Sequence, residues 1–319
     1  MNTAAPRRKP QQPDPMDFSA AKEMAPYLAE PQAMPVGTPG KTGYLRLGFE
    51  LDAEGRSIMR DLERRAPLIV QQELYFDEGM PEMPCVYILS SGGPNVDGDR
   101  YEQHFVVRKG AYAHLSTGAA TKLAEMRYNY SGLRQRFELE EGAYLEFLPE
   151  PTIPCRHTRF IADTTIRIDP TATLFYAEIY MSGRKYFDRG ERFAYDVLSV
   201  TARAERPGGE QLFREKFVIR PGVRSPSSLG AMNGYDVFAN VLVLTPPEAA
   251  DRIYARTEAF IDADRRLAAG ITHLPNGCGL LYKALGDETG PVKRLVRQFC
   301  STVRQEVKHR PLPDEFPWR

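Results

Sequence analysis

Two aspartates in a glycine-rich loop form the first candidate site of this sequence. Residues 92–99 contain three glycines and one proline, a composition that interrupts helices and strands. Asp97 and Asp99 place two carboxylates in that irregular segment. No Gly-Lys-Ser/Thr sequence follows the glycines, so the loop does not match a phosphate-binding loop. The chemistry left open is catalysis by carboxylates or weak binding of a metal ion.

Calcium does not fit this loop. The spacing of Asn95, Asp97 and Asp99 imitates the first positions of an EF-hand loop. An EF-hand needs glycine at its sixth position and glutamate at its twelfth. Because Arg100 and Val106 occupy those positions, we do not expect a calcium site.

Three more residues offer oxygen atoms that could bind a metal ion: Thr121, Glu150 and Glu178. Glu178 lies in the apolar stretch 176–180, where an inward carboxylate is costly unless it is paired or functional. It is therefore either a paired structural charge or a functional group. Asp99 either caps its own loop through Asx-type hydrogen bonds or binds a ligand. Thr121 and Glu150 are either turn residues or ligands.

Carboxylates also allow a catalytic hypothesis. A carbohydrate-active hydrolase or lyase uses two of them, and Glu140, Glu141, Glu146 and Glu150 are available. Sugar sites also need stacking aromatic residues, whereas Trp318 is the only tryptophan. No G-x-S-x-G elbow supports serine catalysis. The carbohydrate-active enzyme is the second hypothesis.

The cysteines do not form a metal or disulfide pattern. The four cysteines are far apart in the sequence and make no CxxC pair, which argues against structural zinc and a disulfide framework. Cys155 and His157 are two residues apart, but the sequence suggests no third ligand nearby. We interpret them as a structural thiol and a surface histidine.

Charge and hydropathy narrow the class of protein. Lys+Arg and Asp+Glu are both 42, so no net field favours nucleic acid or an anionic membrane. No apolar segment approaches the ~20 residues of a membrane span. The N-terminus lacks the apolar region of a signal peptide. These features predict a cytoplasmic protein that binds neither nucleic acid nor membrane.

The chain divides into an N-terminal arm and a mainly β body. Residues 1–40 carry eight prolines, and we predict that residues 1–42 form a disordered or peripheral arm. Period-two alternation from residue 44 predicts half-buried strands. Similar strand–turn–strand units of the hairpin type recur about every thirty residues, at residues 105–115, 137–147 and 166–177. A further hairpin follows at residues 193–219. The recurrence predicts stacked or wound sheets.

The sequence of the last quarter of the chain predicts helices. Thr245 and the prolines after it resemble a helix start, and an apolar stripe continues to Leu267 before Gly270. We therefore expect a helix over residues 245–267. Residues 271–285 read as a hairpin, and residues 291–308 as a second amphipathic helix.

The ordered series of motifs resembles the family of the urease accessory protein UreD, called UreH in some systems. The motifs are, in chain order, Gly98-Asp99-Arg100, Gly110-Ala111, Thr117 to Lys122, Glu141-Gly142-Ala143, residues 148–154, Glu178-Ile179-Tyr180 with Gly183-Arg184, and Gly190 to Phe193. The resemblance covers roughly residues 43–319. It implies a two-layered, helically wound β-sheet structure with two α-helices near the C-terminus, at about residues 245–310.

The resemblance implies a non-catalytic chaperone of nickel insertion that binds apo-urease and UreF, with UreG joining the complex. It implies transient Ni²⁺ rather than a tightly bound cofactor. A carrier that must release Ni²⁺ is better served by hydroxyls and single carboxylates than by a His/Cys cage. Four residues in matching motifs offer such ligands along an internal path: Asp99, Thr121, Glu150 and Glu178.

The basic face of the last predicted helix is the candidate partner surface. Arg294 and Arg297 lie opposite its apolar stripe, and we expect them to face UreF. The alternative is a solvated helix face.

Overall fold

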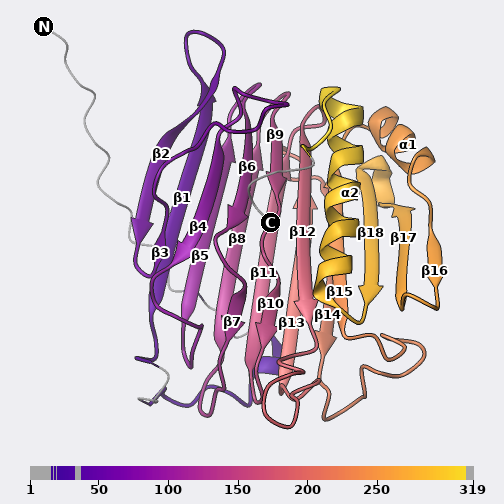
Figure 1. The fold of residues 1–319 in the computed structure, drawn as a ribbon. Helices are drawn as coiled ribbons and strands as arrows, with labels where there is room; N and C mark the ends of the chain where they lie inside the picture. The colour runs from indigo at the N-terminus through magenta and orange to yellow at the C-terminus, as the bar shows by residue number, and fades with distance from the viewer. Residues whose placement is uncertain (1–15, 17, 19, 33–36, 314–319) are drawn as a thin grey trace, which may run out of the picture.

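The computed structural model describes residues 16, 18, 20–32 and 37–313. Two β-sheets lie face to face (Figure 1). The first sheet has seven strands, in the spatial order β14 (Gln211–Ile219), β13 (Val197–Glu205), β11 (Arg159–Ile168), β8 (Ser131–Leu139), β5 (Arg100–Val107), β1 (Thr42–Leu51) and β2 (Ser57–Arg65).

The second sheet has eleven strands, and two of them lie beside the main order. That order is β16 (Phe260–Asp262), β17 (Leu267–His273), β18 (Gly279–Gly286), β15 (Val237–Leu244), β12 (Thr173–Met181), β9 (Tyr144–Phe147), β6 (Tyr112–Thr117), β4 (Cys85–Ser90) and β3 (Leu68–Ile69). The short strands β7 (Thr121–Leu123) and β10 (Thr152–Pro154) pair with each other, and β10 also pairs with β12. The mainly β, two-layered class predicted from the sequence is confirmed.

The chain winds between the two sheets. β5, β8 and β11 are parallel neighbours in the first sheet, while the strands that follow them, β6, β9 and β12, are parallel neighbours in the second. Gly110 and Gly142 make the turns with φ of 69° and 68°, a conformation that favours glycine. The predicted turns are thus present. The hairpin interpretation of these units is wrong, because each turn carries the chain from one sheet to the other.

Aromatic side chains fill the space between the sheets. Phe105 and Phe137 come from the first sheet, and Phe147 and Tyr176 come from the second. The rings of Phe147 and Tyr176 stack with centroids 5.5 Å apart, and Phe105 and Phe137 lie 5.1 Å apart. This close packing fixes the spacing of the sheets beside the site described below.

The helix α2 (Thr289–Lys308) covers the outer face of the second sheet (Figure 1). Val292, Val296, Phe299 and Val303 are buried against that sheet, which confirms the predicted amphipathic helix. At its C-terminal end Arg304 is also fully buried. Its guanidinium bonds both carboxylate oxygens of Glu146 at 2.6 and 2.7 Å, and it also pairs with Asp77.

The first predicted C-terminal helix is too long. α1 (Pro247–Ala255) begins where expected but ends at Ala255. Residues 260–262 and 267–273 are strands instead, and β17 pairs with β18 along its length. Ile261, expected to face inward, is 84% exposed. Cross-strand pairing has overridden a helical spacing of apolar residues that was only approximate.

Part of the N-terminal arm packs on the body. We call Phe18 and residues 20–32 the N-terminal strap; it contains one short helical turn, η1 (Lys22–Met24). Phe18 and Met24 are buried against Tyr130 and the outer side of the first sheet. Glu23 accepts a hydrogen bond from Ser199 Oγ at 2.5 Å and pairs with Lys216 Nζ at 2.7 Å. Residues 1–15, for which the same arm was predicted, lie outside the described residues.

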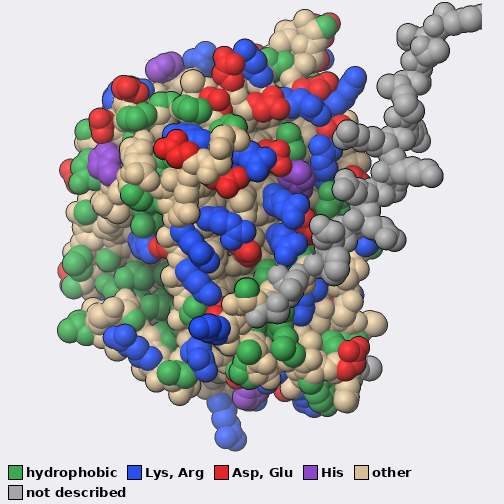
Figure 2. Space-filling view, turned by 180° about the vertical axis from the view of Figure 1, so that it is seen from behind, with side chains coloured by type: hydrophobic (Ala, Val, Ile, Leu, Met, Phe, Trp, Pro, Cys, Tyr) green, Lys and Arg blue, Asp and Glu red, His purple; other side chains and the backbone are tan. Residues whose placement is uncertain are grey.

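The remaining outer face of the first sheet is charged. Figure 2 shows this side of the molecule, where Lys and Arg side chains gather on the surface. Arg46 lies 3.3 Å from Asp61, and Arg203 lies 2.8 Å from Asp163. Ion pairs of this kind partly neutralise the Lys and Arg side chains on this face. Among the described residues, neither α-helix lies on this side of the sheet.

Candidate functional site

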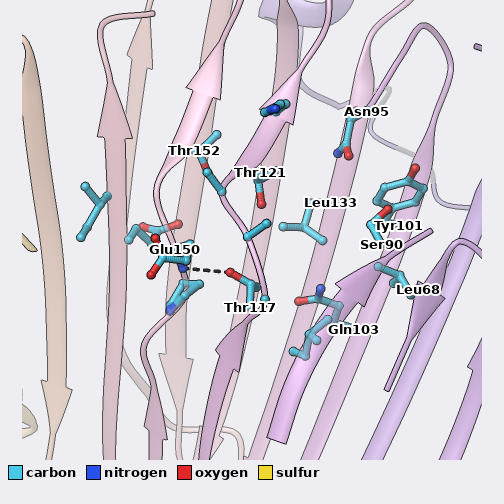
Figure 3. A pocket seen from close by; sticks show the side chains of 18 of the residues that line it. Leu68, Ser90, Asn95, Tyr101, Gln103, Thr117, Thr121, Leu133, Glu150 and Thr152 are labelled. Carbon is cyan, nitrogen blue, oxygen red and sulfur yellow. Dashed lines mark hydrogen bonds between the residues drawn. The ribbon is translucent and has the colours of Figure 1, made fainter. Parts of the chain in front are cut away.

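A cavity of about 410 Å³ lies between the two sheets, with its side chains shown in Figure 3. Its outer rim comes from the loops at residues 93–95 and 117–122, where Gly93, Gly118 and Lys122 are exposed. Its inner wall includes Gln135 and Glu178, which are buried. The cavity therefore runs from the surface into the polar part of the space between the sheets.

The opening lies where two neighbouring strands are interrupted within two residues of each other in register. β6 ends at Thr117 and β9 at Phe147, and their directions resume only in β7 and β10. Small residues and prolines fill the interruptions, and prolines cannot donate ladder hydrogen bonds. At Gly118 an added Cβ would lie 2.2 Å from Leu89 Cδ2, so a larger residue would displace the Leu89 side chain.

Glu178 is the buried carboxylate of the cavity. Only 8% of the residue is exposed. Its Oε1 accepts hydrogen bonds from Tyr180 Oη at 2.9 Å and from Tyr176 Oη at 3.0 Å. Its Oε2 has no hydrogen-bond partner among the described residues. Burial raises the pKa of Glu178 to about 7, and the two tyrosine hydrogen bonds together with the side chain of Asn240, its cross-strand neighbour, only partly offset that effect.

A chain of hydrogen bonds continues from Glu178 across the cavity. Tyr176 Oη lies 3.0 Å from Gln135 Oε1 as well as from Glu178, so its single proton serves one of these acceptors at a time. Gln135 Nε2 donates to Gln103 Oε1 at 2.8 Å. Gln135 and Gln103 are direct partners in the pairing of β5 and β8. Strand register therefore joins a polar row of the first sheet to the carboxylate of the second.

Thr121 and Glu150 lie on the same cavity, as the sequence suggested (Figure 3). Register places Thr121 opposite Thr152, and Thr152 opposite Tyr180. The backbone N–H of Glu150 donates to Thr117 Oγ1 at 2.9 Å. The Glu150 carboxylate itself is held by Lys293 Nζ, at 2.6 and 2.7 Å from its two oxygens.

Asp99 does not lie on the cavity wall. It is fully buried in its own loop. Its carboxylate accepts hydrogen bonds from the backbone N–H groups of Lys41 and Val96, each at 2.9 Å, and from Tyr101 Oη at 3.0 Å. Lys41 Nζ lies 2.8 Å from it. The structure thus brings together three of the four predicted path residues and gives the fourth a role in fixing the loop.

Two features of the site escaped the sequence analysis. Tyr176 and Tyr180 lie two residues before and after Glu178, so the period of a strand places all three on one face; that spacing was a usable signal. Lys293 gave no signal, because an exposed-looking lysine on an amphipathic helix is usually solvated.

The predicted partner residues lie on α2. Arg294 is exposed. Arg297 is partly buried and donates from Nη2 to the carbonyl oxygen of Pro313 at 3.1 Å. The expectation that they face UreF stays a prediction.

The carboxylates of the catalytic hypothesis do not converge. Glu146 is buried beneath α2 in its ion pair with Arg304, and Glu150 is paired with Lys293. Glu140 and Glu141 are exposed at the turn that precedes β9. Of these four carboxylates only Glu150 lines the cavity, so no two of them face one open space.

The donor set of the cavity favours weak binding of a cation. Within residues 16, 18, 20–32 and 37–313, no group of three or more His, Cys, Asp or Glu side chains could hold a metal ion. The cavity instead offers hydroxyls, side-chain amides and separate carboxylates, which bind divalent metals loosely. Neither described helix has the length and apolar character needed to span a bilayer. These features define a wound, two-sheet β-protein with a cavity between its sheets that is lined by hydroxyl, amide and carboxylate side chains.

Comparison with known proteins assigns the family. The sequence profile of the UreD urease accessory protein family matches residues 41–319. The urease accessory protein UreD of Yersinia pseudotuberculosis serotype O:1b (strain IP 31758) is 48% identical over 299 residues, which cover 94% of this chain and 93% of the relative. UreD of Yersinia enterocolitica serotype O:8 is 47% identical over 305 residues, covering 94% and 93%. UreD 2 of Brucella canis is 44% identical over 298 residues, covering 93% and 98%. The chain belongs to the UreD urease accessory protein family, and its role is in urease maturation.

Proposed function

We propose that this chain is a non-catalytic, cytoplasmic chaperone that passes Ni²⁺ through the cavity between its sheets to apo-urease, in a complex with UreF and UreG. The observation that carries the proposal is the unpartnered Oε2 of Glu178, buried on the wall of a cavity that reaches the surface. A buried polar atom without a partner is costly, and a passing cation would satisfy it.

The other ligands suit transit rather than storage. Thr121 and Thr152 lie in register on β7 and β10, and both line the cavity. Hydroxyl oxygens and single carboxylates leave several waters on the ion, so each contact is weak and exchangeable. We assign Glu178 as the inner ligand and Glu150 as a second one. Asp99 has no part in the proposed path, because its carboxylate serves the loop.

The proposed partner surface includes the exposed side of α2, with Arg294 toward UreF. The helix is a firm platform, since its inner face is packed on the second sheet and Arg304 fastens its end. A complex of several proteins needs interfaces of about 1,600 Å² each, and this helix supplies only part of one.

The test is urease activation in cells that carry Glu178→Gln. This change keeps the size and the hydrogen-bonding ability of the side chain but removes the charge that attracts Ni²⁺. We expect urease to assemble with this chain and the other accessory proteins, and to contain several-fold less nickel. Glu205→Gln is the matched control, because Glu205 pairs with Arg167 and does not line the cavity. Full nickel content and full activity with Glu178→Gln would refute the proposed path.

A further inference from the structure

A second, smaller cavity lies next to the first, under α2. It has a volume of about 20 Å³, about the space of one water molecule. Pro149, Glu150 and Ile179 line both cavities. Lys293 lines the small cavity and holds the carboxylate of Glu150. An ion pair therefore stands on the wall that the two cavities share.

We propose that the ion pair of Lys293 and Glu150 is a gate between the two cavities, which opens when a divalent cation replaces the ammonium group at the Glu150 carboxylate. This inference rests on the proposed passage of Ni²⁺ and adds a residue to it. Lys293 acts as a positioning residue, because it binds Glu150 and not the cation.

The ammonium group of Lys293 occupies the position at the Glu150 carboxylate that a bound cation would occupy. Lys293 Nζ contacts both oxygens of Glu150, at 2.6 and 2.7 Å. While the ammonium remains there, it repels a second positive charge and occupies part of the lone-pair space of both oxygens. Once Lys293 swings away, the carboxylate faces both cavities. A flexible four-carbon chain with a compact charge is suited to such a movement.

The strength of the pair is compatible with exchange. The side chains of Lys293 and Glu150 are 26% and 25% exposed, and partly exposed ion pairs of this kind contribute little to stability. The pair of Arg304 and Glu146 is fully buried and lies about three turns further along the same helix. One helix thus carries a fixed pair that holds it and a labile pair that borders the cavities.

The experiment measures binding of Ni²⁺ alone to the purified full chain by isothermal titration calorimetry. Lys293→Met removes the competing charge and keeps the length of the side chain. We expect it to tighten Ni²⁺ binding about fivefold, the equivalent of a partly exposed ion pair. Lys293→Arg, which keeps a positive charge at this position, should stay within twofold of the parent. Lys109→Met breaks a pair of 2.8 Å with Glu141 away from both cavities and should leave Ni²⁺ binding unchanged.

Two more variants separate the gate from the proposed path. In Lys293→Met with Glu150→Gln, the fivefold gain should disappear, because the freed carboxylate is its source. A gain that persists in this double variant, or no gain in Lys293→Met, would overturn the gate. Glu178→Gln should weaken Ni²⁺ binding in both backgrounds. If Glu178→Gln has no effect, or the parent binds no Ni²⁺, the proposed path fails; if only Lys293→Met has no effect, the gate alone fails. Thermal denaturation of each variant confirms that it is folded.

Discussion

Replacing Arg304 with methionine should destabilise the protein more than any change on the exposed face of the same helix. Arg304 is 0% exposed and forms ion pairs with both Glu146 and Asp77. No other Lys or Arg of the described residues forms an ion pair with either carboxylate. Arg304→Met leaves two buried carboxylates without that charge. Breaking a buried pair by removing one partner costs about 3–5 kcal/mol. This loss is a large fraction of the ~5–15 kcal/mol by which folded domains are stable.

The loss should depend on pH in a defined direction. Burial raises the pKa of Glu146, but the charge and hydrogen bonds of Arg304 outweigh burial and hold the pKa well below its usual range. A lowered pKa in the folded state stabilises the protein above the unfolded pKa of about 4.3, and this contribution is lost as pH falls below that value. In Arg304→Met, burial is opposed only by the hydrogen bonds of His114 and Tyr144, so the pKa of Glu146 should rise. The difference between parent and variant should therefore be largest at pH 8 and smaller at pH 5.

Urea denaturation followed by circular dichroism, at pH 5 and pH 8, measures both effects. Arg304→Lys should lose less than Arg304→Met, since it keeps a charge but loses the two-pronged contact with Glu146. Arg294→Met is the control, because Arg294 lies on the same helix and is exposed; it should stay within about 0.5 kcal/mol of the parent. The reasoning is refuted if Arg304→Met loses less than 1 kcal/mol at pH 8, or if its loss is the same at both pH values.

Two further predictions concern the cavity and the strap. Burial raises the pKa of Glu178 to about 7, so its charged form destabilises the fold as pH rises from about 4 through 7; Glu178→Gln should gain stability over the parent between pH 5 and pH 8, by at most about 3 kcal/mol. A difference in unfolding free energy that stays constant with pH would contradict this. Met24 of the strap is 1% exposed, so Met24→Ala should lose about 2 kcal/mol in urea denaturation. Leu28→Ala, at a residue 58% exposed, is its control, and equal losses in the two variants would show that the strap does not pack as described.

Local patterns in the sequence identified the strands but not their partners. Alternation and turns located the hairpin at residues 193–219, whose strands β13 and β14 do form an antiparallel pair. The same signals around Gly110 and Gly142 suggested hairpins, because a tight turn looks alike whether the next strand pairs with the last or enters another sheet. Only the recurrence of the units indicated winding. The distinction depends on long-range pairing, which a local pattern does not contain.

The site could be predicted only in part, because its contacts also join residues that are distant in the sequence. Glu178 stood out because a carboxylate in an apolar strand needs an explanation, and it lies in the cavity. An aspartate in a glycine-rich loop can be a loop cap or a metal ligand, and the sequence does not distinguish the two. Only the hydrogen-bond partners of Asp99 show that it fixes the loop. Arg304 and Lys293 look alike on the helical pattern, yet one is fully buried and the other is 26% exposed. Their partners come from distant segments, so no spacing within the helix could distinguish them.

The buried contact of Arg304 also has a consequence for biosynthesis. Arg304 follows Asp77 by 227 residues and Glu146 by 158 residues. During translation the wound strands emerge first and can stack in the order in which they are made. The arginine that neutralises their two carboxylates arrives near the end. In a chain that terminates before α2, these two carboxylates would lack their arginine partner and the sheet would lack its helix. The fold can therefore be completed only after Arg304, near the end of the polypeptide, has been synthesised.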